Sequence, residues 1–109
     1  MTKGVIAVDY DDTITVDKEM WIEIISIMKK RNFTVVVVTF RIHENDPYLG
    51  LLKVDNSDMN WLYPHVDQII FTGGNKKKKF CEDIGIKPII WIDDKPEWIV
   101  GSEAYKINK

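Results

Sequence analysis

Short apolar runs alternate with segments of helical periodicity along this chain. Four apolar runs with strand character cover residues 4–8, 34–38, 68–71 and 88–92. Between them the pattern predicts a helix after Asp17, a short helix near Ser57, a helix opened by Gly73 and a single helical turn at Pro96. Strands that alternate with helices favour a parallel sheet with helices on its faces. Residues 104–107 add a short edge strand to this prediction.

The segment after Asp17 has the clearest helical pattern. The Asp17 side chain can cap the first turn, and basic residues at 29–31 suit the negative carboxyl end. Apolar residues recur at helical spacing and form one stripe, made of Met20, Trp21, Ile24, Ile25 and Met28. We therefore expect an amphipathic helix here.

Glycine and proline mark the breaks between elements. Residues 40–56 follow no regular period, and the sequence at 45–47 is typical of a turn. The sequence at 73–75 opens a helix that continues to about Ile84, and Gly85 ends it. The chain contains no repeats, and its low-complexity content is a run of four lysines at 76–79.

Composition limits the class of protein. At 109 residues the chain predicts a single domain, residues 1–109, with 45% hydrophobic residues to form its core. The formal net charge of −2 gives no overall attraction to nucleic acid or to an acidic membrane. The single cysteine excludes an internal disulfide, and no apolar run is long enough to cross a bilayer. Without a targeting pattern at the amino terminus, we expect a cytoplasmic protein that does not bind membranes.

Carboxylates gather where two of the predicted strands end. Asp9 and Asp11 follow the first strand, and Asp93 and Asp94 follow the fourth. Functional groups of parallel α/β sheets collect beyond the carboxyl ends of the strands. Several negative charges in such a place cost free energy unless a cation or a reacting phosphoryl group offsets their repulsion. We therefore interpret this region as the active site.

The stretch at 9–13, Asp-Tyr-Asp-Asp-Thr, resembles the first motif, DxDxT, of the haloacid dehalogenase superfamily, most of whose members are magnesium-dependent phosphatases. The family's later motifs appear in order: Thr39 after the second strand, a lysine at the start of a later helix, and the acidic pair after the fourth strand. The resemblance covers nearly the whole chain. It implies a three-layer, Rossmann-like α/β domain whose mainly parallel sheet has the strand order 5-4-1-2-3. That order would bring Asp9, Thr39 and Asp94 into one crevice.

The resemblance implies a role for each acidic residue. Asp9 would be the nucleophile that forms an aspartyl-phosphate, and Asp11 the general acid that protonates the leaving alcohol and then activates water. Mg²⁺ would bind the Asp9 carboxylate, the Asp11 main-chain carbonyl and Asp94. Asp93 would orient the lysine or a metal-bound water, and the assignment within the pair Asp93 and Asp94 stays open.

Thr39 and one of the four lysines would bind the phosphoryl group. Residues 76–79 occupy the first turn of the predicted helix, where the helix dipole disfavours cations, so a nearby negative group should compensate. Lys77 lies one turn before Phe80 on the predicted inward face, which makes it the preferred candidate, with Lys76 next.

Two residues near these motifs are interpreted more cautiously. Asp12 takes a position that glycine often occupies in the family, and we interpret it as a turn residue. Arg41, two positions beyond Thr39, could contact an anionic substrate or lie solvated at the surface.

The sequence leaves no room for a cap domain. Only a short turn separates Thr13 from the first helix, and little separates the third strand from the lysine run. The resemblance therefore implies an open active site. A nucleotide, a nucleic-acid end and a phosphoprotein are all substrates that such a site could take, and a homo-oligomer could complete it.

Two alternative functions remain. A phospho-accepting receiver domain of signalling systems would use Asp11, Asp12, Asp55, Thr72 and Lys95, although residues 55–72 leave little room for the helix and strand that it requires. A catalytically silent relative that serves as a binding module is the second alternative, although the chain retains every catalytic residue type.

Overall fold

Four parallel strands form one sheet in the order β3-β2-β1-β4. The computed structural model describes residues 2–47 and 53–101 of the chain. Within them the strands are β1 (Val5–Val8), β2 (Thr34–Thr39), β3 (Gln68–Phe71) and β4 (Ile90–Ile92). Val8 lies between Val37 of β2 and Ile92 of β4. The expected order 4-1-2-3 is thus present, while the fifth strand, predicted at 104–107, lies outside the described residues.

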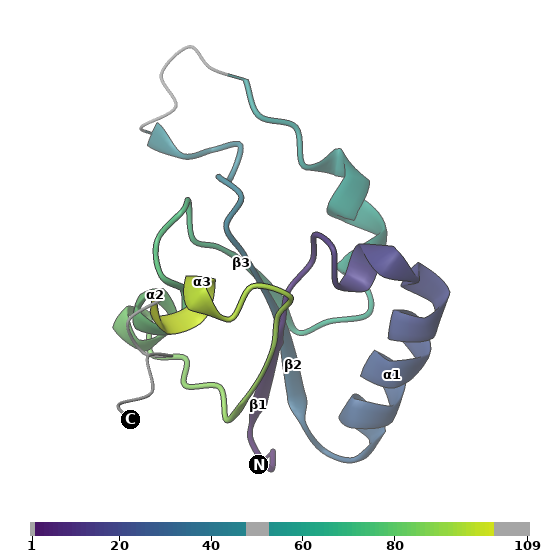
Figure 1. Cartoon of the computed structure of the whole chain (residues 1–109). Coiled ribbons are helices and arrows are strands. Elements are labelled where there is room, and N and C mark those ends of the chain that lie inside the picture. The colour runs from purple at the N-terminus through teal and green to yellow at the C-terminus, as the bar shows by residue number, and fades with distance from the viewer. Residues whose placement is uncertain (1, 48–52, 102–109) are drawn as a thin grey trace, which may run out of the picture.

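Helices cover both faces of this sheet, which confirms the α/β class. Helix α1 (Lys18–Lys30) packs on one face, and α2 (Lys77–Asp83) and α3 (Glu97–Val100) lie on the other, as Figure 1 shows. Two 3₁₀ segments, η1 (Ile14–Val16) and η3 (Ser57–Leu62), lie on the α1 side. None of the helices in the described part of the chain has the length and apolar character needed to span a bilayer.

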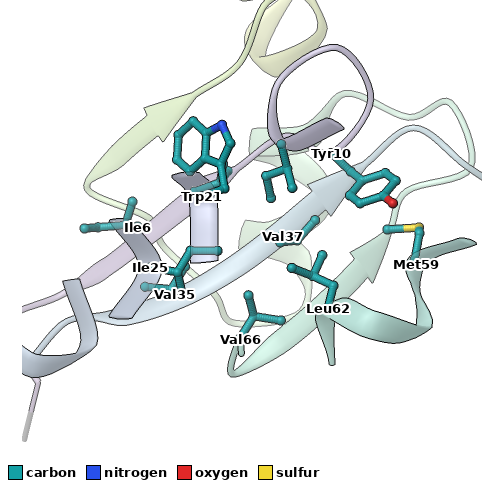
Figure 2. Close-up of a cluster of buried hydrophobic side chains, with 11 residues drawn as sticks. Ile6, Tyr10, Trp21, Ile25, Val35, Val37, Met59, Leu62 and Val66 are labelled. Atoms are coloured by element: carbon teal, nitrogen blue, oxygen red, sulfur yellow. The ribbon is translucent and has the colours of Figure 1, made fainter. Parts of the chain in front are cut away.

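Alternating strand residues build two apolar cores, one on each face. Because successive side chains of a strand point to opposite faces, β2 sends Val35 and Val37 towards α1 and Val36 and Val38 towards α2. The α1 side holds the larger cluster, shown in Figure 2, whose buried members are Ile6, Val8, Tyr10, Ile14, Trp21, Ile25, Val35, Val37, Met59, Leu62 and Val66. Burial on both faces explains why the strands are continuous apolar runs.

Helix α1 begins as its sequence predicts. The Asp17 carboxylate accepts a hydrogen bond from the Met20 N–H at 3.0 Å and caps the first turn. Trp21 and Ile25 are buried as expected, but the assignment of Met20 to the apolar stripe was wrong, because its side chain is exposed. Met20 lies in the first turn of the helix, whereas Ile24 and Met28, which follow on the same side, pack against the core cluster.

Helix α2 begins later than predicted, at Lys77 instead of Gly73. Gly73 and Gly74 adopt φ values of 59° and 83°, which belong to the left-handed region and are incompatible with a continuing α-helix. The Asn75 N–H and side-chain amide both donate to the Thr72 carbonyl, which closes this turn. The glycines therefore form a turn after β3, and this turn determines which lysine starts the helix.

The packing of α1 is tested by Ile25→Ala. Loss of a side chain that is 1% exposed should leave a cavity against the sheet and lower the free energy of unfolding by about 2–5 kcal/mol. Ile27→Ala makes the same change in the same helix at a position that is 58% exposed, and it should alter the free energy by less than about 0.5 kcal/mol. Urea unfolding of both variants measures the difference, and equal losses would contradict this packing.

Candidate active site

Asp9 occupies the point where the strand order reverses. It is the first residue after β1, and its N–H donates to the Ile92 carbonyl of β4 at 2.8 Å. The chain crosses from β1 to β2 and β3 on one side and returns to place β4 on the other side. In open α/β sheets, ligands bind beyond the strand ends at such a reversal.

A fully buried lysine links the ends of β1 and β4. Lys77 Nζ donates to Asp9 Oδ1 at 2.9 Å and to Asp93 Oδ2 at 2.5 Å, and no part of the Lys77 residue is exposed. Its ammonium also lies 5.4 Å from the centroid of the Phe40 ring. A buried ammonium is stable only when paired and hydrogen-bonded, and the two carboxylates meet that requirement.

The other three lysines of the run do not share this position. Lys76 precedes the helix and is exposed. Lys78 and Lys79 pair along the helix surface with Glu82 and Asp83, four residues on. The structure thus brings Lys77 to Asp9, as the inward-face argument predicted.

Three carboxylates converge beside Lys77. Oxygen atoms of Asp9, Asp93 and Asp94 all lie within 4.8 Å of one another. The second oxygen of Asp93 accepts the Lys95 N–H at 2.9 Å, which fixes this carboxylate at the start of the loop after β4. Asp94 is the exposed member of the group. Hard oxygen donors at this spacing could hold a metal ion, with Asp94 exposed and Asp93 bonded to the lysine.

The Asp9 carboxyl lies in an environment that disfavours its charge. Burial raises its pKa to about 7, the neighbouring Asp94 and Asp93 act in the same direction, and Lys77 opposes them. Thr13 Oγ1 donates to Asp9 Oδ2 at 3.2 Å. With one ammonium among three carboxylates, this cluster has spare negative charge for a cation to balance.

Asp11 lies apart from that cluster, in the turn after β1. Asp12 has a φ of 60°, which accounts for a turn position that glycine would also suit. The Asp11 side chain is 50% exposed and forms a two-bond contact with Arg41, from Nε at 2.9 Å and from Nη2 at 2.7 Å. Neither sequence interpretation of Arg41, solvated residue or substrate contact, included this pairing.

Thr39 ends β2 beside the site and is buried. Its hydroxyl oxygen accepts the Arg41 N–H at 3.2 Å, and its carbonyl accepts both the N–H and the hydroxyl of Thr72. The Arg41 contact uses a lone pair of this hydroxyl and leaves the hydroxyl hydrogen out of that bond.

Sequence reasoning missed Asp58 and Asn56. Arg41 Nη1 donates to Asp58 Oδ1 at 2.7 Å, and Nη2 donates to Asp58 Oδ2 at 2.9 Å. Arg41 Nη1 also donates to Asn56 Oδ1 at 3.4 Å. The Asn56 side-chain NH₂ group donates to the Ile42 carbonyl and to the Glu44 carboxylate. Asn56 and Asp58 lie 15 and 17 residues after Arg41, across an irregular segment. No local sequence pattern therefore indicates that they pair with Arg41.

The residues of the receiver alternative are not gathered in this way. Asp55 lies just before η3, and its carboxylate accepts the Ser57 N–H at 2.8 Å. Thr72 is buried with its hydroxyl bonded to Thr39. Lys95 extends over the Trp98 ring, 5.4 Å from its centroid.

Comparison of the chain with protein-family models, with curated proteins and with solved structures finds no match.

The raised pKa of Asp9 predicts a pH-dependent stability in protein freed of divalent ions by a chelator. The folded carboxyl keeps its proton up to a pKa of about 7, whereas the unfolded carboxyl loses it near 3.8. The stabilisation that protonated Asp9 gives the folded protein is therefore complete below about pH 4 and is lost as the pH rises towards 7. Asp9→Asn cannot titrate, so its free energy of unfolding should rise relative to that of the wild type across this range.

Urea unfolding at several pH values measures this relative change. Asp12→Asn makes the same substitution at an exposed position and serves as the control. A stability difference between Asp9→Asn and wild type that is constant with pH would contradict the environment described for Asp9.

Proposed function

We propose that this protein is a magnesium-dependent phosphomonoester hydrolase of the haloacid dehalogenase type, working through an aspartyl-phosphate. The observation that carries the proposal is the meeting of buried Asp9 with Lys77, Asp93 and Asp94 at the reversal of strand order. A carboxylate that is buried, aimed by a lysine and surrounded by spare negative charge suits a nucleophile that works beside a cation.

The first half-reaction transfers the phosphoryl group to Asp9. An Asp9 oxygen attacks phosphorus in line, the bond from phosphorus to the ester oxygen breaks, and Asp11 gives its proton to the departing oxygen. The products are an alcohol and an aspartyl-phosphate. The Lys77 ammonium is bonded to Asp9 Oδ1, so it can balance the charge that the phosphoryl group brings to this side chain.

The second half-reaction regenerates the enzyme. The Asp11 carboxylate takes a proton from water, and the water oxygen attacks phosphorus and displaces the Asp9 carboxylate. Inorganic phosphate leaves, and Asp11 is protonated again. The Thr39 hydroxyl, at the end of the neighbouring strand, would donate to a phosphoryl oxygen in both steps.

Asp9 and Asp94, together with the Asp11 main-chain carbonyl, are the groups that we propose to hold Mg²⁺. Bound there, the ion would polarise the phosphoryl oxygens and offset the repulsion among the carboxylates. Asp93, which Lys77 and the Lys95 N–H already occupy, would act by orienting Lys77.

The likeness to capless members suggests a substrate that reaches an open site. Three residues of η1 separate Thr13 from the segment that leads into α1, and residues 72–76 join β3 to α2, so neither connection carries a cap. A nucleotide, a nucleic-acid end and a phosphoprotein remain the candidate substrates for a cytoplasmic enzyme, alone or as a homo-oligomer.

Hydrolysis of 4-nitrophenyl phosphate tests this function. Wild-type protein should turn over the ester with Mg²⁺, lose activity in excess chelator and regain it when Mg²⁺ is restored. Asp9→Asn should lower kcat/KM by about 10³-fold or more, because the nucleophile is removed. Asp12→Asn, three residues further on and outside the cluster, should retain wild-type turnover.

Turnover that persists in Asp9→Asn would remove Asp9 from the mechanism. Turnover that is unaffected by the chelator would contradict the metal requirement.

A further inference from the structure

Every hydrogen-bond donor of the Arg41 guanidinium is engaged. Its five N–H groups are satisfied by two bonds to Asp11, two to Asp58 and one, at 3.4 Å, to Asn56 Oδ1. None of them is left for a phosphate oxygen. Arg41 also faces two carboxylates with a single positive charge, so the group presents no net attraction to an anionic substrate.

The guanidinium is fixed relative to the nucleophile. The Arg41 side chain is 24% exposed, and the central carbon of its guanidinium lies 5.2 Å from the centroid of the Tyr10 ring. Tyr10 is the residue between Asp9 and Asp11 in the sequence. The Arg41 N–H donates to Thr39 Oγ1. Arg41 is thus held by its main-chain N–H, by the buried Tyr10 ring and by the two carboxylates that its guanidinium binds, so this side chain has little freedom to move.

Asp58 anchors the far side of this arrangement. Its main-chain carbonyl accepts the Tyr10 hydroxyl at 3.0 Å, and that hydroxyl accepts the Trp61 indole N–H at 3.2 Å. Arg41 also holds the pKa of the Asp58 carboxyl below its usual value, which keeps this anchor charged. The η3 segment thus connects, through Asp58 and Arg41, to the turn that carries Asp11.

Asp11 needs such a support more than Asp9 does. Asp9 is buried and aimed by Lys77, whereas Asp11 is half exposed and its described side-chain contacts are with Arg41. A proton-transfer group must lie within hydrogen-bond reach of the reacting oxygen, and small displacements are costly in rate. As Asp11 gives up and takes a proton in each cycle, the second fork to Asp58 keeps the guanidinium in place.

We infer that Arg41 is the positioning residue of the general acid–base Asp11, and that Asp58 anchors Arg41 for this purpose. The inference rests on the proposed function, because it assigns Arg41 an effect on one step of that reaction. It makes Arg41 a determinant of how well the enzyme cleaves esters with poor leaving groups.

The dependence of rate on the leaving group tests this role. The value of kcat/KM reports the steps up to release of the alcohol, and an alkyl alcohol needs a proton to leave whereas 4-nitrophenol hardly does. Arg41→Gln should lower kcat/KM for a simple alkyl phosphate by about 10²-fold and for 4-nitrophenyl phosphate by only a fewfold. Asp58→Asn, which keeps Arg41 and its contact with Asp11, should show the same selectivity with a smaller loss.

A double-mutant comparison separates positioning from a direct role. If Arg41 acts through Asp11, Arg41→Gln should cost nothing further on alkyl phosphates in an Asp11→Asn background. Arg31→Gln, the same change at the exposed end of α1, controls for loss of a positive charge and should leave both rates unchanged.

Three outcomes would overturn the inference. Equal losses on the two esters in both Arg41→Gln and Asp58→Asn would indicate a structural role, and additive losses in the double variant would place Arg41 on the substrate. Failure of the wild type to hydrolyse either ester overturns the proposed function itself, and the inference with it, so the two failures are distinguishable.

Discussion

The buried ammonium of Lys77 is the constraint on which the site depends. Hydrogen bonds from Lys77 Nζ to Asp9 and Asp93 connect the ends of β1 and β4. Without the ammonium, the Asp9 and Asp93 carboxylates would carry uncompensated buried charge. That position requires two features of the fold: β4 must pair with β1, and α2 must begin at Lys77. The turn formed by Gly73 and Gly74 after β3, with its left-handed φ values, makes α2 begin at Lys77. The backbone conformation of two glycines thus determines which lysine reaches Asp9.

The two halves of the site use different electrostatic solutions. Asp9 is buried, and this burial, with Asp94 and Asp93 nearby, raises its pKa to about 7; the three carboxylates together could hold a metal ion. Asp11 belongs to a more exposed pair of forks around Arg41, where every donor is used. This separation fits the roles that we propose for the two residues, because a nucleophile benefits from burial while a proton-transfer group must reach both substrate and water.

The sequence predicted the sheet well because strands buried on both faces are continuous apolar runs. It also selected Lys77, since helical periodicity points that residue inward with Cys81, which is buried. It misplaced the start of α2, because a Gly-Gly-Asn sequence suits a helix opening and a turn equally, and only the bonds to the Thr72 carbonyl decide between them. The partners of Arg41 could not be predicted, since they depend on the path of an irregular segment.

Locating the transferred phosphoryl group on the chain decides whether Asp9 accepts it, as we propose. Asp11→Asn should slow the hydrolysis of the proposed intermediate, so this variant can be acid-quenched during reaction with 4-nitrophenyl phosphate and Mg²⁺. Borohydride reduction then converts an aspartyl-phosphate to homoserine, which peptide mass spectrometry locates. We expect homoserine at position 9. Homoserine at position 55, or a chain without homoserine while nitrophenol is released in a burst, would mean that Asp9 does not accept the phosphoryl group.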